Sequence, residues 1–225
     1  MKHYDSFENI KYDQSLIGEE VWAFEKLDGQ NFCVKYSPKT KEFPCFGSRK
    51  CIVGEGDEMF GGAIRYFKDN GFADILRNIV DKNRDKKGVF AGIDEITFFF
   101  EWYGPNSFAG FHQPGEELKL SLIDVFLKKK GYMEPKIFWD LFEGSGISLP
   151  RLIYRGKLTR DFIRDIQEND WTQEGCKYPD LKEGVVVKRS TLMKGQRLPK
   201  AKIKTSWWLS ELHKKYSEEE CKILE

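Results

Sequence analysis

A lysine placed to act as a nucleophile is the first candidate for chemistry in the sequence. Lys26 begins the tetrapeptide Lys-Leu-Asp-Gly, and the stretches 21–24 and 32–36 on either side have the apolar or alternating pattern of β-strands. A lysine amine attacks only after it loses its proton, and burial or neighbouring cations promote that loss by lowering its pKa. The tetrapeptide alone also fits a hairpin turn with a solvated lysine, so other residues must decide between the two.

Two further polar side chains lie where predicted strands end. Arg49 follows the short strand-like segment 43–48, and its guanidinium offers a fork of donors for a phosphate or a ribose. In the segment from 88 to 104, three phenylalanines at 98–100 predict a strand buried on both faces. Glu101 follows them and is expected to end that strand. A carboxylate there needs a partner. A ribose hydroxyl, a cation or a salt bridge would serve Glu101, and Arg49 also fits an ordinary surface arginine.

Lysines gather on predicted strands in the last third of the chain. Glu183 stands at the start of a β-branched strand that ends at Lys188. In the segment 201–204, Lys202 and Lys204 are two residues apart, so a strand presents both on one face. Paired cations of this kind suit an anionic ligand such as a phosphate.

The remaining pattern predicts the elements that would position these side chains. Apolar spacing and turn residues predict helices over 58–87 (split at Asn70-Gly71), 135–142, 159–166 and 206–216, and further strands over 118–127 and 149–154. Pro150 restricts the last of these strands to a sheet edge. The expected class is α+β.

Composition limits the class of protein. The 225 residues, 40% of them hydrophobic, are enough for one filled core, and we expect a single domain over residues 1–225. A net charge of +1 means that a polyanion would need locally clustered cations. The five cysteines form no Cys-x-x-Cys pair, which argues against a disulfide framework or zinc ribbon and favours a reducing, cytoplasmic location. No segment is apolar for long enough to span a bilayer, so no membrane association is expected.

Six short motifs occur in an order that resembles a known superfamily. They occupy residues 26–29, 48–49, 100–104, 123–124, 183–188 and 202–204. In this order they look like the collinear motifs of covalent nucleotidyltransferases, the superfamily of ATP-dependent ligases and capping enzymes. The forms Phe-Glu-Trp-Tyr-Gly and Asp-Gly-Gln-Asn-Phe most resemble the RNA ligase family, in particular its nick-sealing double-strand branch. The resemblance covers residues from about 21 to 208.

The resemblance implies a covalent mechanism in which ATP donates AMP. Lys26 would attack the α-phosphate, form a lysyl-AMP and release pyrophosphate. Lys202 and Lys204 would neutralise the charge that develops on the phosphate. Glu183 would help to place Mg²⁺ (or Mn²⁺) through the water shell of the metal. An RNA-adenylate would follow, and a 3′-hydroxyl end would be joined to a 5′-phosphate end.

Further residues at matching positions would contact the nucleotide. Asn31 and Arg49 would hold the ribose and phosphate side, and Glu101 would bind the ribose. The other residues of this set are Glu25, Leu27 and Ile123. Lys188 would be a further cation in the pocket that binds the anionic phosphates.

Two departures from the family pattern concern the substrate and the base. Many double-strand RNA ligases have His at the position of Asp28, where Asp is more usual in DNA ligases. An aromatic residue usually precedes the aspartate of the pair 123–124. Here that residue is Ile123, so the adenine would stack on a different ring or pack against aliphatic carbon.

The resemblance implies an α+β nucleotidyltransferase (ATP-grasp-like) domain with central antiparallel sheets, outer helices and no OB-fold. The predicted function is an ATP-dependent RNA ligase, acting as a monomer on the 5′-phosphate and 3′-hydroxyl ends of a nicked or bridged duplex. One alternative is a DNA ligase catalytic domain of the same superfamily. The other is a nucleic-acid-binding homologue without catalysis, which predicts no covalent label from α-labelled ATP.

Overall fold

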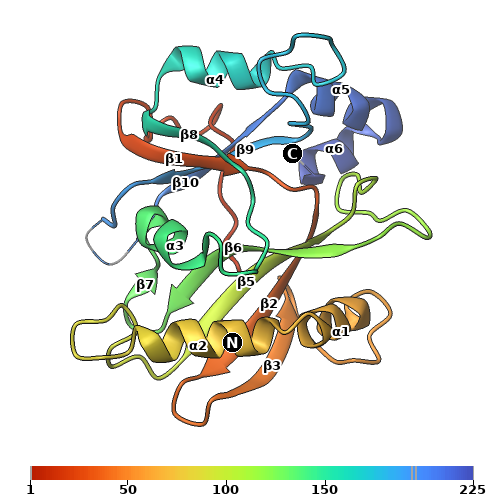
Figure 1. The fold of residues 1–225 in the computed structure, drawn as a ribbon. Coiled ribbons are helices and arrows are strands. Elements are labelled where there is room, and N and C mark those ends of the chain that lie inside the picture. The colour runs from red at the N-terminus through yellow and green to blue at the C-terminus, as the bar shows by residue number, and fades with distance from the viewer. Residues whose placement is uncertain (1, 194, 196, 225) are drawn as a thin grey trace. The chain divides into compact units, whose positions relative to one another are not determined.

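The computed structural model describes residues 2–193, 195 and 197–224, which fold into two compact units (Figure 1). Unit 1 comprises Met1–Asp5, Gly29–Leu149 and Lys194–Arg197. Unit 2 comprises Ser6–Asp28, Pro150–Met193 and Leu198–Glu225. The chain therefore crosses from one unit to the other inside the Lys-Leu-Asp-Gly tetrapeptide. A single domain over residues 1–225 stays a prediction.

Unit 1 is built on a six-stranded antiparallel sheet with the strand order β4-β3-β2-β5-β6-β7. Its elements are β2 (Gly29–Ser37), β3 (Glu42–Ser48), β4 (Ile52–Val53), α1 (Gly61–Asp69), α2 (Phe72–Lys82), β5 (Ile96–Tyr103), β6 (Lys119–Leu127), β7 (Gly131–Tyr132) and α3 (Pro135–Phe142). Side chains from all three helices pack on one face of this sheet and close its core.

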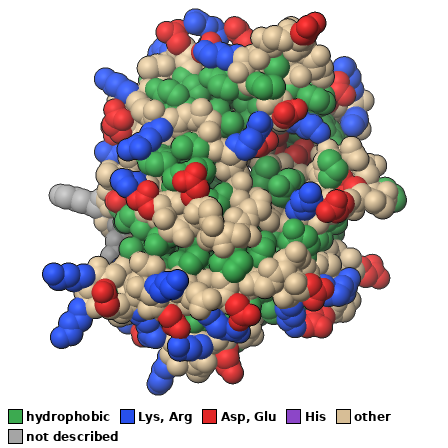
Figure 2. Space-filling view, in the orientation of Figure 1, with side chains coloured by type: hydrophobic (Ala, Val, Ile, Leu, Met, Phe, Trp, Pro, Cys, Tyr) green, Lys and Arg blue, Asp and Glu red, His purple; other side chains and the backbone are tan. Residues whose placement is uncertain are grey.

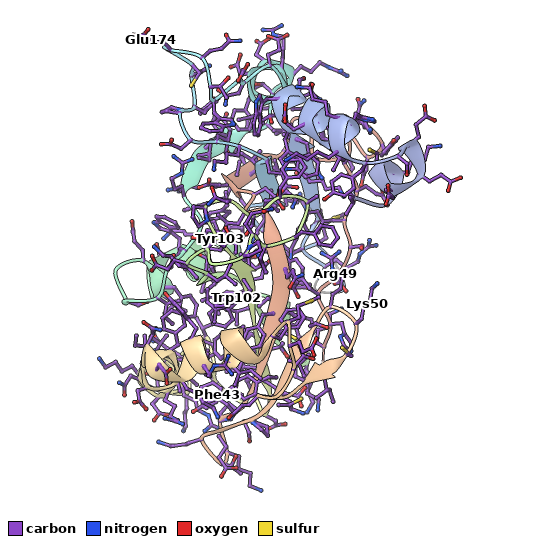
Figure 3. All side chains as sticks on the ribbon, turned by 90° about the vertical axis from the view of Figure 1, so that its right-hand side faces the viewer. Phe43, Arg49, Lys50, Trp102, Tyr103 and Glu174 are labelled. Carbon is purple, nitrogen blue, oxygen red and sulfur yellow. The ribbon has the colours of Figure 1, made fainter. Side chains whose placement is uncertain are left out.

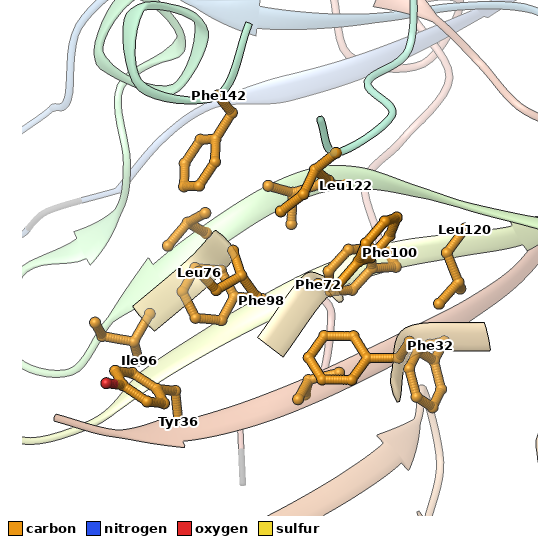
Figure 4. Packing of buried hydrophobic residues seen from close by; sticks show 14 of the residues in the cluster. Phe32, Tyr36, Phe72, Leu76, Ile96, Phe98, Phe100, Leu120, Leu122 and Phe142 are labelled. Carbon is orange, nitrogen blue, oxygen red and sulfur yellow. The ribbon is translucent and has the colours of Figure 1, made fainter. Parts of the chain in front are cut away.

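The core of unit 1 is rich in aromatic rings (Figure 4). Phe98 and Phe100 point into it from β5, and Phe72 of α2 stacks on Phe100 with centroids 6.0 Å apart. Phe99 is also fully buried, although it points to the opposite face, where it contacts Tyr132. The prediction that this strand is buried on both faces is confirmed.

Unit 2 is built on a four-stranded antiparallel sheet with the strand order β10-β9-β1-β8. Its elements are β1 (Glu20–Glu25), β8 (Leu152–Lys157), α4 (Arg160–Gln167), β9 (Gly184–Arg189), β10 (Lys200–Lys204), α5 (Ser206–Lys215) and α6 (Glu218–Leu224). The two faces of the sheet differ in kind. One carries small and β-branched residues that pack with α4, including Val21, Val185 and Ile203. The other carries lysines and aromatic rings.

Most of the predicted elements are present. The sheets are antiparallel and the helices pack outside them, so the predicted α+β class is confirmed. The helical stretch 58–87 divides at Asn70-Gly71 as predicted. Thr159 caps α4 by accepting a hydrogen bond from the amide of Phe162, and β8 is an edge strand.

Three predictions about strands are wrong in detail. The strand predicted over 88–104 begins only at Ile96, because the residues before it form turns. Glu101 does not end that strand, which continues to Tyr103 because Trp102 also packs in the core. The tetrapeptide at Lys26 does not close a hairpin, because β1 and β2 belong to different sheets.

The surface is mixed in charge. Figure 2 shows lysine and arginine side chains interspersed with aspartate and glutamate over the face that it draws, in keeping with the net charge of +1. Among the described helices, none combines the length and the hydrophobicity needed to cross a lipid bilayer.

Candidate functional site

Lys26, Glu183 and Lys204 form one ion-paired group in unit 2. Glu183 Oε1 lies 2.9 Å from Lys26 Nζ and 3.1 Å from Lys204 Nζ. The side chain of Lys26 is 23% exposed, whereas those of Glu183 and Lys204 are 4% and 2% exposed. Lys26, which directly follows β1, is therefore held by the buried carboxylate of Glu183. The alternative interpretation, a solvated lysine on a hairpin turn, is wrong.

Lys204 experiences both desolvation and competing charges. Burial lowers the pKa of Lys204 to about 8; Glu183 opposes the shift, and Lys26 and Lys202 add to it. One carboxylate thus faces several ammonium groups. A phosphate that entered this group would supply the missing negative charge, which favours binding of an anion.

The sheet register places the other predicted cations on the same face. On β10, Lys202 and Lys204 alternate with Ala201 and Ile203, which are buried in the core on the other face. The prediction that the two lysines share a face is confirmed. Lys188 of β9 is paired with Lys200 of β10 and therefore belongs to this face as well. The Lys188 amine lies 5.2 Å from the centroid of the Phe24 ring.

A glycine lets Glu183 reach this position. Gly184 has a φ of 139°, and a Cβ atom built there would lie 2.0 Å from the carbonyl oxygen of Ile203. Any other residue would push β9 away from β10 or strain the backbone. The Gly184 carbonyl also accepts a hydrogen bond from the amide of Lys26 at 2.8 Å, which fixes the backbone of the two motifs side by side.

A second layer of contacts holds Lys204 in place. Trp208 Nε1 donates to Asp28 Oδ2 at 2.7 Å, and the indole ring lies 3.6 Å from Lys204 Nζ. Thr205 caps α5 by accepting from the amide of Trp208. The Lys204 amine also donates to the carbonyl oxygen of Leu224 at 2.8 Å. Asp28 therefore supports Lys204 through Trp208. The sequence placed Trp208 only within the helix predicted over 206–216.

Glu25 forms an ion pair with Arg151. Its carboxylate receives hydrogen bonds from Arg151 Nε at 2.6 Å and Nη2 at 3.3 Å. The contact of Glu25 with a nucleotide stays a prediction. Leu27 is half-buried.

Glu183 is also the residue that fits a divalent cation. Its second oxygen, Oε2, is buried and has no hydrogen-bond partner among the described residues. Hard divalent cations prefer carboxylate oxygens, and Mg²⁺ keeps most of its waters. A buried carboxylate oxygen without a donor is unusual, and a hydrated cation would satisfy it.

In unit 1, Asn31 and Glu101 form a second predicted group. They face each other across β2 and β5, on the side of the sheet opposite to the aromatic core. Asn31 is 8% exposed, and its Nδ2 donates to the carbonyl of Phe100 at 3.3 Å. Asn31 Oδ1 is a buried acceptor with no hydrogen-bond partner among the described residues. A hydroxyl donor, such as that of a ribose, would satisfy it.

Arg49 lies just beyond the ladder of β2 and β3. The last pair of that ladder joins Phe32 and Ser48, and Arg49 begins the bend that leads from β3 to β4. The Arg49 and Lys50 side chains are exposed and lie at the end of β3 (Figure 3).

Ile123 lies at a β-bulge in the same sheet. The pairing of β5 with β6 shifts there, so that Phe99 faces Asp124 whereas Phe100 faces Leu122. The bulge turns Asp124 to the side that carries Glu101. Asp124 is 1% exposed and accepts a hydrogen bond from Tyr4 Oη at 2.6 Å. Nothing in the polar N-terminal sequence marked Tyr4 as part of this group.

The predicted site residues thus fall into two groups. Unit 2 holds Glu25, Lys26, Leu27, Glu183, Lys188, Lys202 and Lys204, and unit 1 holds Asn31, Arg49, Glu101 and Ile123. Direct contacts join Lys26, Glu183 and Lys204 in the first group. In the second group, the register of the strands aligns Asn31 with Glu101.

The comparisons with known proteins agree on the family and the fold. A family model described as RNA ligase matches residues 19–204. A Naegleria gruberi RNA ligase variant in its apo form has a TM-score of 0.65 at 13% identity, over 96% of this chain and 58% of the other. Another variant of that ligase, with ATP and manganese, has a TM-score of 0.64 at 16% identity with coverages of 96% and 58%.

A proposed ATP-dependent DNA ligase from Aquifex aeolicus has a TM-score of 0.56 at 18% identity, over 93% of this chain and 51% of the other. The chain therefore spans between half and three fifths of the length of these solved structures. No curated protein matches the chain.

Proposed function

The chain belongs to the RNA ligase family, and we propose that it is an ATP-dependent RNA ligase that acts through a lysyl-AMP intermediate. The observation that supports this most strongly is the contact of Lys26 and Lys204 with one buried carboxylate, Glu183. A nucleophilic amine, a cation for the phosphate and a carboxylate for a metal are the groups that adenylyl transfer requires.

In the first step, the neutral Lys26 amine forms a nitrogen–phosphorus bond to the α-phosphate of ATP. The bond from the α-phosphorus to the bridging oxygen breaks, and pyrophosphate leaves with the electron pair. The proton lost by the lysine passes to a nearby base, for which Glu183 Oε1 is placed at 2.9 Å. Lys202 and Lys204 offset the negative charge on the non-bridging oxygens. Lys188 adds positive charge to the same face.

In the later steps, AMP moves to the RNA and then leaves. A 5′-phosphate oxygen attacks the phosphorus of lysyl-AMP, which frees Lys26 and gives an RNA-adenylate. The 3′-hydroxyl of the other end then attacks the 5′-phosphorus, loses its proton and displaces AMP. Both steps build up charge on phosphate oxygens, so the lysine face of unit 2 serves all three.

The residues of unit 1 would hold the nucleoside. Asn31 and Glu101 present an acceptor and a carboxylate on the same side of the sheet, which suits the hydroxyls of a ribose. Arg49 at the end of β3 suits a phosphate. Ile123 would pack against the adenine. In unit 2, Leu27 and the Glu25 backbone would complete the nucleotide contacts.

Mg²⁺ or Mn²⁺ would be the divalent cation, held by Glu183 and water. When bound, the ion would neutralise phosphate charge and orient the leaving pyrophosphate. Two observations support this proposal: the unsatisfied Glu183 Oε2, and the Naegleria gruberi variants whose structures hold manganese with ATP or AMP.

The substrate we propose is a nicked or bridged RNA duplex, bound by a monomer in the reducing cytoplasm. All five cysteines are free thiols, which supports the compartment. The fold similarity to the Aquifex aeolicus protein supports the DNA ligase alternative. Sealing assays on nicked RNA, nicked DNA and mixed duplexes, each with one labelled 5′-phosphate, separate the two. Faster sealing of DNA nicks than of RNA nicks would overturn the RNA assignment.

A further inference from the structure

The N-terminal strap, defined as residues 2–10, contacts Asp124 of unit 1 and Lys202 of unit 2. We infer that Tyr4 of this strap is a positioning residue for ATP, acting through Asp124. The inference rests on the proposed function, because it assumes that the polar face of the six-stranded sheet receives the nucleoside. It assigns a nucleotide role to a residue that lies outside every sequence motif.

Tyr4 is fixed by contacts on several sides. Its hydroxyl donates to Asp124 Oδ2 at 2.6 Å, and its ring lies 4.9 Å from the ring of Phe99, centroid to centroid, at 48°. The ring of Tyr132 approaches it edge-on at 6.2 Å. Tyr4 is only 7% exposed. A tyrosine packed in this way keeps one position, so the carboxylate that it binds is also oriented.

Asp124 lies beside the proposed ribose site. It is paired with Phe99 on β5, and Glu101 is two residues further along that strand, on the same face. Two residues along a strand span roughly 7 Å, which is within the size of a nucleoside. Burial raises the pKa of Tyr4 well above its usual value; the Asp124 carboxylate adds to the shift and Glu101 contributes to it. Tyr4 therefore remains a neutral donor near two carboxylates.

Tyr4 also brings an aromatic ring to a place where the sequence lacks one. The position before Asp124 is the aliphatic Ile123, at the bulge. The rings of Tyr4, Phe99 and Tyr132 gather around Asp124 instead. The N-terminal strap thus adds one ring, that of Tyr4, to the buried aromatic side chains next to this aspartate.

The other end of the strap holds the strand that carries the phosphate lysines. The amide of Ile10 donates to the carbonyl of Lys202 at 2.9 Å, and the amide of Lys202 donates to the carbonyl of Glu8 at 3.0 Å. These bonds make a parallel bridge between Asn9 and Lys202 at the free edge of β10. The strap therefore contacts Asp124 through Tyr4 and Lys202 through Glu8 and Ile10.

The test measures ATP binding without turnover. In a Lys26→Ala background, which cannot form lysyl-AMP, the Kd for Mg-ATP is measured by calorimetry for Tyr4→Phe and Tyr4→Ala. Loss of a hydrogen bond to a charged group should raise the Kd by about tenfold for Tyr4→Phe, and further for Tyr4→Ala. The matched control is Tyr12→Phe in the same segment, since Tyr12 is 70% exposed and should leave the Kd unchanged.

A double-mutant cycle with Asp124→Asn separates positioning from general destabilisation. If Tyr4 acts through Asp124, the two substitutions together should weaken ATP binding little more than Asp124→Asn alone. Additive effects, or a Kd for Tyr4→Phe and Tyr4→Ala equal to that of the parent, would overturn the inference while leaving the ligase proposal intact. Failure of the parent to bind Mg-ATP at all would overturn both.

Discussion

The polar faces of the two sheets differ in charge, and our proposal assigns a different part of a nucleotide to each. Each sheet has one apolar face that closes a core and one polar face that carries predicted site residues. The polar face in unit 2 is cationic, with lysines gathered around a single buried glutamate. The polar face in unit 1 carries the amide of Asn31, the carboxylates of Glu101 and Asp124 and the hydroxyl of Tyr4. Among the described residues that we predicted for the site in unit 1, the only cation is the exposed Arg49.

The difference shows how charge selects what each sheet can hold. Buried lysines whose charge exceeds that of their counterion attract phosphate oxygens. A buried acceptor such as Asn31 Oδ1 instead needs a hydroxyl or N–H donor, which a ribose or a base provides. A nucleotide presents both kinds of group, which is why our proposal uses both sheets.

The largest effect is expected at Glu183, the buried carboxylate that pairs with Lys26 and Lys204. Glu183→Gln keeps the shape of the side chain but leaves Lys26 and Lys204 without a counterion. A general base, the role that we propose for Glu183, typically contributes 100- to 10,000-fold to a rate, so we expect formation of lysyl-AMP to slow by roughly 1,000-fold. Single-turnover labelling measures the rate, and Glu211→Gln, in a more exposed pair with Lys214, is the control. A loss below tenfold would remove Glu183 from the mechanism.

Lys204 should matter to chemistry more than to folding. Lys204→Met keeps most of the buried stem and removes the charge, and loss of one such group usually slows a reaction by about 100- to 1,000-fold. Because burial already disfavours the charged form of Lys204, the thermal unfolding midpoint should change little. Lys200→Met, on the same strand and face, should slow labelling less than tenfold. Equal effects of the two substitutions would show that only the total charge matters.

The cores should respond according to their side chains. Phe100 is fully buried in the aromatic core of unit 1, and Phe100→Ala should cost about 3–5 kcal/mol of unfolding free energy. Val187 in the aliphatic core of unit 2 is smaller, and Val187→Ala should cost about 2 kcal/mol. Urea unfolding gives both values. A cost for Phe100→Ala at or below that of Val187→Ala would contradict the contrast between the cores.

A smaller effect with a definite pH dependence is expected in the loop between β5 and β6. The Glu116 carboxylate accepts from the amides of Asn106 and Gln113 and from Ser107 Oγ at 2.8, 2.9 and 2.9 Å. Burial alone would raise the pKa of Glu116, but these donors outweigh it and lower the pKa. A lowered folded-state pKa stabilises the fold above the unfolded pKa of about 4.3, and this stability is lost as the pH falls.

Glu116→Gln should therefore destabilise the protein by about 1–3 kcal/mol at pH 7. The difference from the wild type should shrink below pH 4, where the wild-type carboxylate gains its proton. Thermal unfolding across this range measures the trend. A difference that stays constant with pH would mean that the charge of Glu116 makes no contribution.

Local patterns in the sequence were enough to predict most of the elements and the lysine face. Successive side chains of a strand point to opposite faces, so residues two apart share a face. Lys202 and Lys204 could therefore be placed together from the sequence. Apolar spacing likewise identified α1, α2 and α3. The two-residue strands β4 and β7 are too short to produce such a pattern.

Contacts between distant residues could not be read in this way. The tetrapeptide at Lys26 has the same turn residues whether it closes a hairpin or, as found, joins two sheets. Tyr4 meets Asp124 across 120 positions of sequence, and Trp208 meets Asp28 across 180. Arg151 was likewise missed as the partner of Glu25. Such pairs depend on tertiary packing, for which a single sequence carries no periodic signal.

Covalent labelling tests the role of Lys26 most directly. The protein is incubated with Mg²⁺ and either α-labelled or γ-labelled ATP and then separated on a denaturing gel. We predict that the wild type retains the α label and not the γ label, and that Lys26→Ala retains neither while keeping the wild-type unfolding midpoint. Full α labelling of Lys26→Ala, or no α labelling of the wild type, would contradict the assignment of Lys26 as the nucleophile.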